Sequence, residues 1–322
     1  MSGDKGGSGS AVTGDLPGAR AAASDGRVSA YPDHLRAAVD AYLKDLRFSA
    51  EAGTQGLEDA MRYSLLAGGK RIRPVLALAT AEAIGMPSAD VMPLAAALEL
   101  IHTYSLIHDD LPAMDDDDLR RGKPTCHVAF GEDVAILAGD GLYAEAFRHM
   151  LSFQAGEPIN ILRAAAELAA ATGVTGMVGG QYLDVEDSAP AGAGGLRHVH
   201  ELKTGRLIRA SVECVLLIEG RQAPAAVSQF KAFASELGVL FQIVDDILDV
   251  TGSDQALGKP SGSDERHGKR TYVTEFGLQG ARAMARESQR RATEALDGAG
   301  LAGDADPALL HQITAFIAQR SY

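Results

Sequence analysis

The chain has 322 residues, of which 46% are hydrophobic, and acidic residues outnumber basic ones 43 to 30. This length and apolar content predict one large domain or two small ones with a deep core. The formal net charge of −13 argues against a general nucleic-acid-binding protein, which would present a basic surface. Cys126 and Cys214 are far apart and lack metal-binding spacing, so we expect reduced thiols in a cytoplasmic protein.

The N-terminal segment differs in composition from the rest of the chain. Residues 1–30 are rich in Gly, Ser, Ala and Asp, which predicts a disordered tail because such a segment buries too little apolar surface. It lacks a basic start followed by an apolar stretch, so we expect no signal peptide. We also expect no membrane span, because no apolar run approaches the roughly 18 residues that a transmembrane helix needs.

From Tyr31 onward the pattern is helical. Apolar residues recur at helical spacing from Leu35 to Leu46. Further helices are predicted over residues 57–66, 74–84, 92–107, 134–151, 159–171, 196–220, 225–250, 281–296 and 307–320. Gly/Ser-rich loops are expected at 188–195 and 251–268, and alternating strand patterns are nearly absent. The sequence therefore predicts an all-α domain over residues 31–322, with too many apolar helices for a simple four-helix bundle.

Two clusters of aspartates stand out. The first joins Asp109-Asp110 to four aspartates at 115–118, and the second is the segment 245–249, Asp-Asp-Ile-Leu-Asp. In the second cluster Asp245 and Asp249 are four residues apart and share a helical face, where carboxylates repel one another unless a cation lies between them. In the first, Pro112 disfavours a regular helix, so the insert 111–114 must loosen the chain to bring the later aspartates back.

The donor atoms and their surroundings indicate the kind of site. Oxygen-only ligands suit Mg²⁺ better than Zn²⁺, and Mg²⁺ is typically held by one or two carboxylates plus substrate phosphates. The spacing of a calcium-binding EF-hand loop is missing. Residues 116–118 taken alone are also typical of a solvated acidic loop. Each cluster follows an apolar helical run, which favours a substrate with a phosphate head and a hydrocarbon tail.

Basic and polar residues occur at several further positions. In the turn 68–74, Lys70 and Arg73 could converge on one anion, although the Walker pattern of nucleotide-binding loops is absent. His102 lies two helical turns before Asp109. Other polar residues interrupt apolar helices or flank the second cluster: Gln181, Lys203, Thr204, Gln242, Lys259 and Lys269. Each of them taken singly is typical of a core or surface position with no catalytic or binding role.

Together these segments resemble the trans-isoprenyl diphosphate synthases of the polyprenyl synthetase family. Residues 105–122, Ser-Leu-Ile-His-Asp-Asp-Leu-Pro-Ala-Met-Asp-Asp-Asp-Asp-Leu-Arg-Arg-Gly, resemble the first aspartate-rich motif of this family in its bacterial, inserted form. Residues 241–249, Phe-Gln-Ile-Val-Asp-Asp-Ile-Leu-Asp, resemble the second. The turn 68–74, Lys203-Thr204 and Leu257-Gly-Lys259 fit as well. The resemblance runs from about residue 31 to the end and is greatest to bacterial farnesyl diphosphate synthases.

The resemblance implies a helical bundle around a deep central cavity and a role for each motif residue. About three Mg²⁺ ions would be held on an allylic diphosphate, by Asp109, Asp110, Asp115, Asp245 and, more loosely, Asp249. The allylic diphosphate would be bound by Arg120, Lys203 and Lys259, and isopentenyl diphosphate by Lys70, Arg73, His102 and Arg121. Thr204 and Gln242 would turn oxygens toward a carbocation, Lys269 would close the site, and Gln181 is a further candidate for substrate binding.

The implied reaction is ionisation of the allylic C–O bond, attack by the double bond of isopentenyl diphosphate, and loss of a proton to the departed diphosphate. Product length is expected to depend on Tyr104 and Ser105. Tyr104 lies five residues before Asp109, about 7–8 Å deeper along the helix. A ring there would cap the growing tail, as in farnesyl diphosphate synthases, unless Tyr104 only packs in the core.

The resulting hypothesis is a magnesium-dependent farnesyl diphosphate synthase, and the resemblance also implies a homodimer. Three alternatives remain open. One is a geranylgeranyl diphosphate synthase. Another is a class I terpene cyclase, which normally replaces the second aspartate motif with a mixed Asn/Ser/Glu triad. The third is a non-catalytic subunit of a heteromeric synthase, in which one acidic motif is commonly degraded.

Overall fold

The computed structural model describes residues 31–320 except 187, 189, 191, 253–268 and 302–304. The predicted N-terminal tail therefore lies outside the described residues. The helices are α1 (Asp33–Asp45), α2 (Gln55–Leu65), α3 (Ile72–Ala83), α4 (Met92–Asp109), α5 (Cys126–Phe130), α6 (Glu132–Phe153), α7 (Pro158–Thr172), α8 (Met177–Val185), α9 (Ala193–His200), α10 (Arg206–Glu219), α11 (Pro224–Thr251), α14 (Tyr272–Asp297) and α15 (Ala308–Gln319). Short 3₁₀ turns span Ala52–Thr54 and Ser88–Val91, and a π-helical segment, η3, spans Glu201–Gly205.

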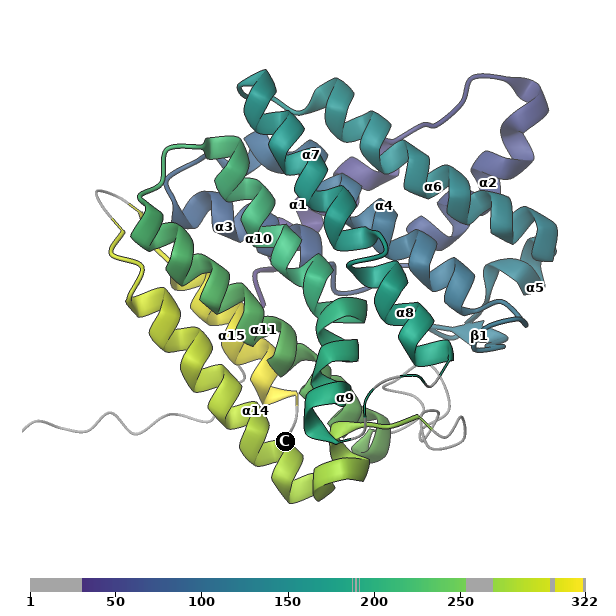
Figure 1. Cartoon of the computed structure of the whole chain (residues 1–322). Helices are drawn as coiled ribbons and strands as arrows, with labels where there is room; N and C mark the ends of the chain where they lie inside the picture. The colour runs from purple at the N-terminus through teal and green to yellow at the C-terminus, as the bar shows by residue number, and fades with distance from the viewer. Residues whose placement is uncertain are drawn as a thin grey trace, which may run out of the picture.

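The predicted all-α class is confirmed (Figure 1). Among the described residues, strand structure is confined to an antiparallel pair, β1 (Leu119–Arg120) and β2 (Lys123–Pro124). The pair forms a short hairpin directly after the first aspartate cluster. This hairpin turns the basic residues at 120–121 back toward the end of α4.

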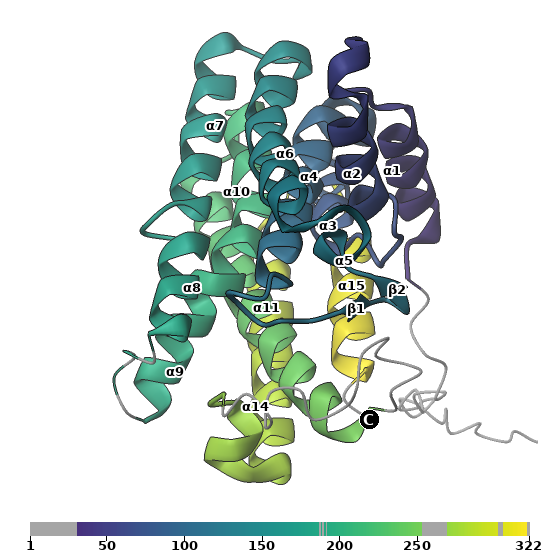
Figure 2. The same ribbon diagram turned by 90° about the vertical axis from the view of Figure 1, so that its right-hand side faces the viewer.

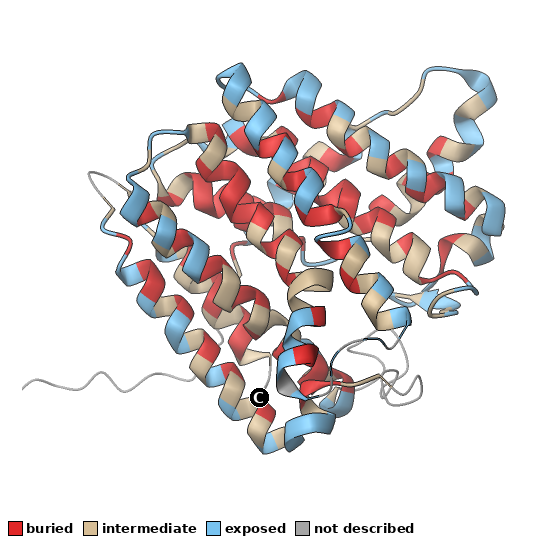
Figure 3. Cartoon of the chain, in the orientation of Figure 1, coloured by how far each residue is buried: buried red, intermediate tan, exposed pale blue. Residues whose placement is uncertain are grey.

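Helix α4 forms the centre of the core. It is apolar nearly all round, and its residues from Pro93 to Ile101 are buried, as expected for a helix enclosed by others. Its main neighbours are α3 and α6, while α11 packs along α14 and against α10 and α15. Figure 3 shows the buried residues concentrated between these helices and the exposed ones on their outer faces. The C-terminal ends of α4 and α11, which carry the two aspartate clusters, thus belong to opposite walls of one bundle.

Several predicted boundaries need correction. The predicted helix 196–220 is three pieces, α9, η3 and α10. The helix expected at 281–296 begins earlier, at Tyr272, because Thr271 and Thr274 form a capping box and Gly277, with a φ of 69°, bends the chain within the helix. Helix α8 was not predicted, since a pair of glycines weakens its pattern. Most of the expected loop 251–268 lies outside the described residues, and α11 continues through Thr251.

The expectation about apolar runs also needs correction. Residues 158–185 are long and apolar enough to cross a membrane by length and composition alone, with a mean hydropathy of 1.3 in an 18-residue window. However, the backbone leaves the helical conformation at Gly173 and Gly176, so α7 and α8 are separate helices of 15 and 9 residues. Neither is long enough alone for the roughly 20 residues that a span requires. Only 39% of the window is buried, which leaves an apolar outer face along these helices.

Candidate active site

The first aspartate cluster lies on a turn that folds back on the end of α4. The helix ends at Asp109, and the amide of Asp115 donates to the carbonyl of Asp109 at 2.9 Å. Asp116 takes a left-handed conformation, with a φ of 54°, which asparagine and aspartate tolerate better than most residues. The insert that contains Pro112 therefore loosens the chain as the sequence predicts, and it returns Asp115 to the side of Asp109.

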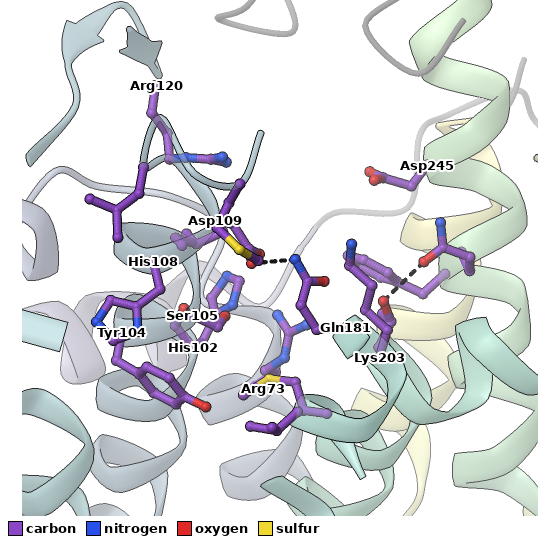
Figure 4. A pocket seen from close by; sticks show the side chains of 18 of the residues that line it. Arg73, His102, Tyr104, Ser105, His108, Asp109, Arg120, Gln181, Lys203 and Asp245 are labelled. Atoms are coloured by element: carbon purple, nitrogen blue, oxygen red, sulfur yellow. Dashed lines mark hydrogen bonds between the residues drawn. The ribbon is translucent and has the colours of Figure 1, made fainter. Parts of the chain in front are cut away.

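A cavity of about 620 Å³ opens between this turn and α11 (Figure 4). Much of its wall is apolar, with Leu106, Leu111, Ile136, Met177, Val178 and Phe241 among the lining residues. The predicted site residues that line it are Arg73, His102, Tyr104, Ser105, Asp109, Arg120, Arg121, Gln181, Lys203, Thr204, Gln242 and Asp245. Most of the predicted site therefore does meet around one apolar space, although its members come from six separate segments.

The carboxylates of Asp109 and Asp245 lie on opposite sides of the cavity mouth (Figure 4). Asp109 accepts a hydrogen bond from Nε2 of Gln181 at 2.8 Å. Burial raises the pKa of Asp109 to about 6; nearby Lys203 opposes this rise and Asp115 adds to it. A carboxylate held in this way binds a proton or a cation more readily than a solvated one.

Two other aspartates of the first motif are engaged with cations of the chain itself. Asp110 is buried, and the Nη2 atom of Arg120 donates to its Oδ1 at 2.5 Å. Burial raises the pKa of Asp110, against the effect of the Arg120 guanidinium. Asp115 pairs with Nζ of Lys269 at 3.0 Å. These contacts hold the motif together, so a metal at Asp110 or Asp115 would compete with Arg120 and Lys269.

The aspartates of the second cluster have unequal surroundings. Asp245 is exposed to the cavity, whereas Asp246 and Asp249 are 2% and 5% exposed. A smaller cavity of about 190 Å³ adjoins the first. It is lined by Asp246, Asp249 and Lys269, and by four residues that line both cavities: Lys203, Thr204, Gln242 and Asp245. All three acids thus contribute to the smaller cavity, but only Asp245 is exposed and also lines the larger one.

The donor set fits Mg²⁺ that is completed by a substrate. Within the described parts of the chain, no group of three or more His, Cys, Asp or Glu side chains is close enough to enclose an ion. Asp109 and Asp245 offer only carboxylate oxygens, and they approach from opposite sides. Because Mg²⁺ is bound through one or two carboxylates plus phosphate oxygens and water, these residues suit ions that bridge the protein to a diphosphate.

A basic wall lies beside the first motif. The Nε atom of Arg73 is buried and has no hydrogen-bond partner among the described residues. Burial lowers the pKa of Arg73 and of nearby His102, and the guanidinium of Arg73 lowers that of His102 further. A neutral His102 can still donate one hydrogen bond. Together with Arg121, which also lines the cavity, these residues offer hydrogen-bond donors that an anion would satisfy.

Lys70 lies apart from the cavity lining. Its side chain is exposed, and its Nζ lies 5.2 Å from the ring centroid of Phe316 in α15. Partial desolvation of its ammonium group by nearby chain and the charge of Arg320 lower the pKa of Lys70 to about 8. Arg320 was not singled out from the sequence, because a lone basic residue near a chain end carries no distinguishing pattern.

A buried ion pair holds the basic turn in place. Arg71, in the left-handed region with a φ of 52°, donates to Glu99 of α4 at 2.6 Å and to Asp40 of α1 at 2.9 Å. Next to it, Gly69 has a φ of 129°, and a Cβ there would lie 2.7 Å from Cζ of Arg121. The middle of this turn is therefore structural, and of its basic residues Arg73 is the one that lines the cavity. Sequence reasoning missed Glu99, since a single acid inside an apolar helix has no visible partner.

The segment η3 presents Lys203 and Thr204 to the cavity. Nζ of Lys203 donates to Asp184 at 2.6 Å, and Oγ1 of Thr204 donates to Oε1 of Gln242 at 3.0 Å. A π-helical turn shifts side chains out of the regular helical register and is frequent at functional sites. Gly180 of α8 lies so close that a Cβ would be 2.3 Å from the backbone nitrogen of Lys203, so the glycine pair permits this contact.

The bottom of the cavity is aromatic. Tyr104 is 9% exposed, and its ring packs edge-on against Tyr143 of α6 at 5.0 Å and against His108 at 5.6 Å. Behind it, Tyr143 contacts Phe147 and shares a hydrogen bond with Thr172 at 3.3 Å. The sequence pointed only to Tyr104 and Ser105 of this helix, because the aromatic residues behind Tyr104 come from α6. Of the remaining predicted residues, Lys259 lies outside the described part of the chain.

Comparison with known proteins identifies the family to which this arrangement belongs. The sequence profile of the family described as polyprenyl synthetase matches residues 54–299. The chain belongs to the polyprenyl synthetase family. The structure agrees: a geranyltransferase from Helicobacter pylori, in complex with magnesium and isoprenyl diphosphate, superposes with a TM-score of 0.78 at 31% identity, over 91% of this chain and 98% of that one. The predicted family and isoprenoid-synthase helical fold are thereby confirmed, and membership supports prenyltransferase activity.

Relatives of known sequence carry two different product names. The large subunit 1 of a heterodimeric chloroplastic geranylgeranyl pyrophosphate synthase from Arabidopsis thaliana is 47% identical over 249 residues, which cover 75% of this chain and 67% of that protein. A farnesyl diphosphate synthase from Geobacillus stearothermophilus is 46% identical over 258 residues, which cover 78% and 86%. Similarity therefore supports a trans-prenyl synthase without deciding between the two chain lengths.

Proposed function

We propose that this protein is a farnesyl diphosphate synthase, which condenses isopentenyl diphosphate with dimethylallyl or geranyl diphosphate. The observation that carries the proposal is one apolar cavity with Asp109 and Asp245 facing each other at its mouth and the ring of Tyr104 at its bottom. The mouth suits a diphosphate with its metal ions. The apolar wall suits an isoprenoid tail, and the ring sets the depth available to it.

The charged residues divide between the two substrates. Asp109 and Asp245, with Asp110, Asp115 and Asp249 around them, would hold about three Mg²⁺ ions on the allylic diphosphate, and these ions supply positive charge that stabilises the leaving diphosphate. Residues proposed to bind the same group directly are Arg120, Lys203 and Lys259, with Gln181 beside them and Lys269 closing the mouth. Those proposed for isopentenyl diphosphate are Lys70, Arg73, His102 and Arg121.

The chemistry then needs positioning and charge more than a side-chain base. The allylic C–O bond breaks, and both of its electrons leave with the diphosphate. The π electrons of isopentenyl diphosphate form the new C–C bond, and a proton passes to a diphosphate oxygen. The oxygens of Thr204 and Gln242, which are joined by a hydrogen bond of 3.0 Å, would lie near the positive charge that forms in between. Such fixed dipoles in a site shielded from water are effective because they need no reorganisation during the reaction.

Geranylgeranyl diphosphate synthase is the second candidate, and the plant relatives favour it. The aromatic layers at the bottom of the cavity favour the shorter product, because Tyr104 is backed by Tyr143 and Phe147 and has little room to swing aside. A terpene cyclase is disfavoured by the three aspartates of the second motif, and a non-catalytic subunit by the presence of both motifs.

We also propose a homodimer. Large apolar side chains are more than 50% exposed along the outer faces of two adjacent helices, α6 and α7, which lie side by side in Figures 1 and 2. They are Leu137, Phe153, Ile159 and Leu162. Patches of this kind in a water-soluble enzyme mark protein interfaces, and a second copy of the chain would cover both helices through a symmetric contact.

One assay tests the catalytic proposal. The purified protein is incubated with Mg²⁺, isopentenyl diphosphate and each allylic primer in turn, and the dephosphorylated products are separated by chromatography. Farnesol from both primers is the expected result. Geranylgeraniol as the main product supports the second candidate. Turnover of farnesyl diphosphate without isopentenyl diphosphate contradicts a synthase and indicates a cyclase, and no turnover at all contradicts both synthase proposals.

A further inference from the structure

Asp246, the middle aspartate of the second motif, does not line the larger cavity and contributes only to the wall of the smaller one. It is 2% exposed, although its neighbour Asp245 is exposed to the cavity. Its Oδ1 accepts a hydrogen bond from Nε2 of Gln242 at 2.7 Å, one helical turn back. Its Oδ2 accepts one from the backbone amide of Tyr272 at 2.7 Å, the first residue of α14. Both of its oxygens are thus bound to the protein in an arrangement that differs from that of a metal ligand open to substrate.

These contacts fix the orientation of the Gln242 amide. An ionised carboxylate only accepts hydrogen bonds, so the NH₂ end of Gln242 must face Asp246. The amide oxygen is then turned toward Thr204, whose hydroxyl donates to it at 3.0 Å. Since the proton of this hydroxyl is committed to Gln242, the lone pairs of Thr204 Oγ1 are left for the cavity that Thr204 lines.

The same carboxylate joins two walls of the site. The amide of Tyr272 is one of the unpaired N–H groups at a helix start, where a negative charge is favourable. The Tyr272 side chain is 1% exposed, and its ring packs against that of His200 at 5.3 Å, directly before η3. Asp246 therefore connects α11, α14 and the segment that carries Thr204.

We propose that Asp246 is a positioning residue that acts through Gln242 to hold the Thr204 hydroxyl oxygen toward the positive charge that develops on the allylic substrate. This inference rests on the proposed synthase function and adds a residue that acts without touching substrate or metal. With the Gln242 amide reversed, its NH₂ group would face Thr204, and the hydroxyl proton would be free to turn into the cavity. The site would then present the hydroxyl hydrogen of Thr204, the positive end of the O–H dipole, to a cation.

The test compares binding of two probes by calorimetry in the presence of Mg²⁺. One is a bisphosphonate with a protonated amine in its side chain, and the other is its isostere with a methylene in place of the amine. Their affinity ratio measures the preference of the site for positive charge. In Thr204→Val this ratio should fall roughly 10- to 100-fold, the range of one hydrogen bond to a charged group, while Thr204→Ser should retain it.

Asp246→Asn should lower the same ratio by at least about fivefold, because the amide is no longer held in one orientation. The double variant with Thr204→Val should then show no further loss, since both changes remove the same interaction. Thr271→Ala is the control for docking of α14. It removes the cap of that helix and leaves the contact between Asp246 and Gln242, so it should lower thermal stability with an unchanged ratio.

Two outcomes would overturn the proposal. Equal weakening of both probes by Asp246→Asn would assign Asp246 to metal or diphosphate binding. Loss of thermal stability with an unchanged affinity ratio would assign it to folding alone. The probes report binding without turnover, so a failure here is distinct from the failure of chain elongation in the wild-type assay described above.

Discussion

At the scale of single residues, Tyr104 is the position on which product length depends most directly. Replacing it with alanine removes a ring from the bottom of the cavity and should lengthen the main product by one isoprene unit. The tail should stop there, because the ring of Tyr143 lies 5.0 Å behind. The measurement is chromatography of the dephosphorylated products. Tyr104→Phe is the matched control, which retains the ring and should retain the wild-type product.

Removing both rings extends this prediction. The variant with Tyr104→Ala and Tyr143→Ala should give products longer than those of Tyr104→Ala, while Tyr143→Ala alone should leave the product unchanged because Tyr104 still closes the cavity. An unaltered product in Tyr104→Ala would refute the aromatic floor and would mean that Tyr104 only packs in the core. Longer products from Tyr143→Ala alone would show that Tyr104 does not close the cavity unaided.

Asp109 gives a prediction for pH dependence in the metal-free protein. Its pKa is raised from 3.8 to about 6 in the folded state, so between these values the folded protein holds a proton that the unfolded chain has lost. Protonated Asp109 therefore adds up to about 3 kcal/mol to the free energy of unfolding. This contribution is fully present below about pH 4 and is lost as pH rises through 6. Chemical denaturation measures the free energy of unfolding of the wild type and of Asp109→Asn. The difference between the two free energies should change with pH over this range and be constant above pH 7.

Mg²⁺ with diphosphate provides the complementary measurement. Binding to the ionised carboxylate should recover stability mainly above pH 6 in the wild type and less in Asp109→Asn. If the difference in unfolding free energy between the wild type and Asp109→Asn does not change from pH 4 to 8, the pKa of Asp109 is not raised by the fold.

The identity of the site residues could be read from the sequence, but their orientation could not. Asp109 and Asp245 were recognisable because acids beside apolar helices stand out. The partners of Asp110 and Asp246 depend on a hairpin and on the start of α14, which come together only in the folded chain. Neighbouring aspartates with the same local pattern therefore have different environments.

At the scale of elements, Gly180 controls the contact between α8 and η3. A Cβ at this position would lie 2.3 Å from the backbone nitrogen of Lys203, and backbone cannot move aside as a flexible side chain can. Gly180→Ala should therefore separate the two elements, displace Lys203 and Gln181, and lower kcat/KM by at least about tenfold, a barrier change of about 1.4 kcal/mol. Steady-state kinetics with both substrates measures this effect.

Gly194 provides the matched control for this substitution. It lies in α9, is exposed, and a Cβ there would have no atom within 4 Å. Gly194→Ala should retain activity and raise stability slightly, since alanine favours helix over glycine by about 1 kcal/mol. Equal activity of the two variants would show that close approach of α8 to η3 is not required.

The elements themselves were predictable to different degrees. Long apolar helices such as α4 and α11 were found because their pattern persists over several turns. Helix α8 and the π-helical turn were missed, since both depend on glycines that allow close packing between segments rather than on local propensity. Irregular backbone of this kind surrounds Lys203, which is where the site departs most from a regular bundle.

At the scale of the whole molecule, the exposed apolar face of α6 and α7 predicts association. Light scattering after gel filtration should give twice the chain mass of 33.6 kDa. Leu162→Glu should yield monomers, because the side chain is 58% exposed in one chain and a symmetric contact would bury the new charge twice, at a cost of several kcal/mol for each copy. A monomeric wild type at micromolar concentration would contradict the proposed interface.

A second exposed apolar residue distinguishes this interface from general surface effects. Phe276 of α14 is 36% exposed and belongs to a helix on the opposite side of the molecule from α7 (Figure 1). Phe276→Glu should therefore remain dimeric. Helix α6 also carries Tyr143, which supports the bottom of the cavity, so loss of the partner should loosen this wall. The monomeric Leu162→Glu variant should accordingly make a broader mixture of products than Phe276→Glu, whereas identical mixtures would mean that the cavity is independent of the partner.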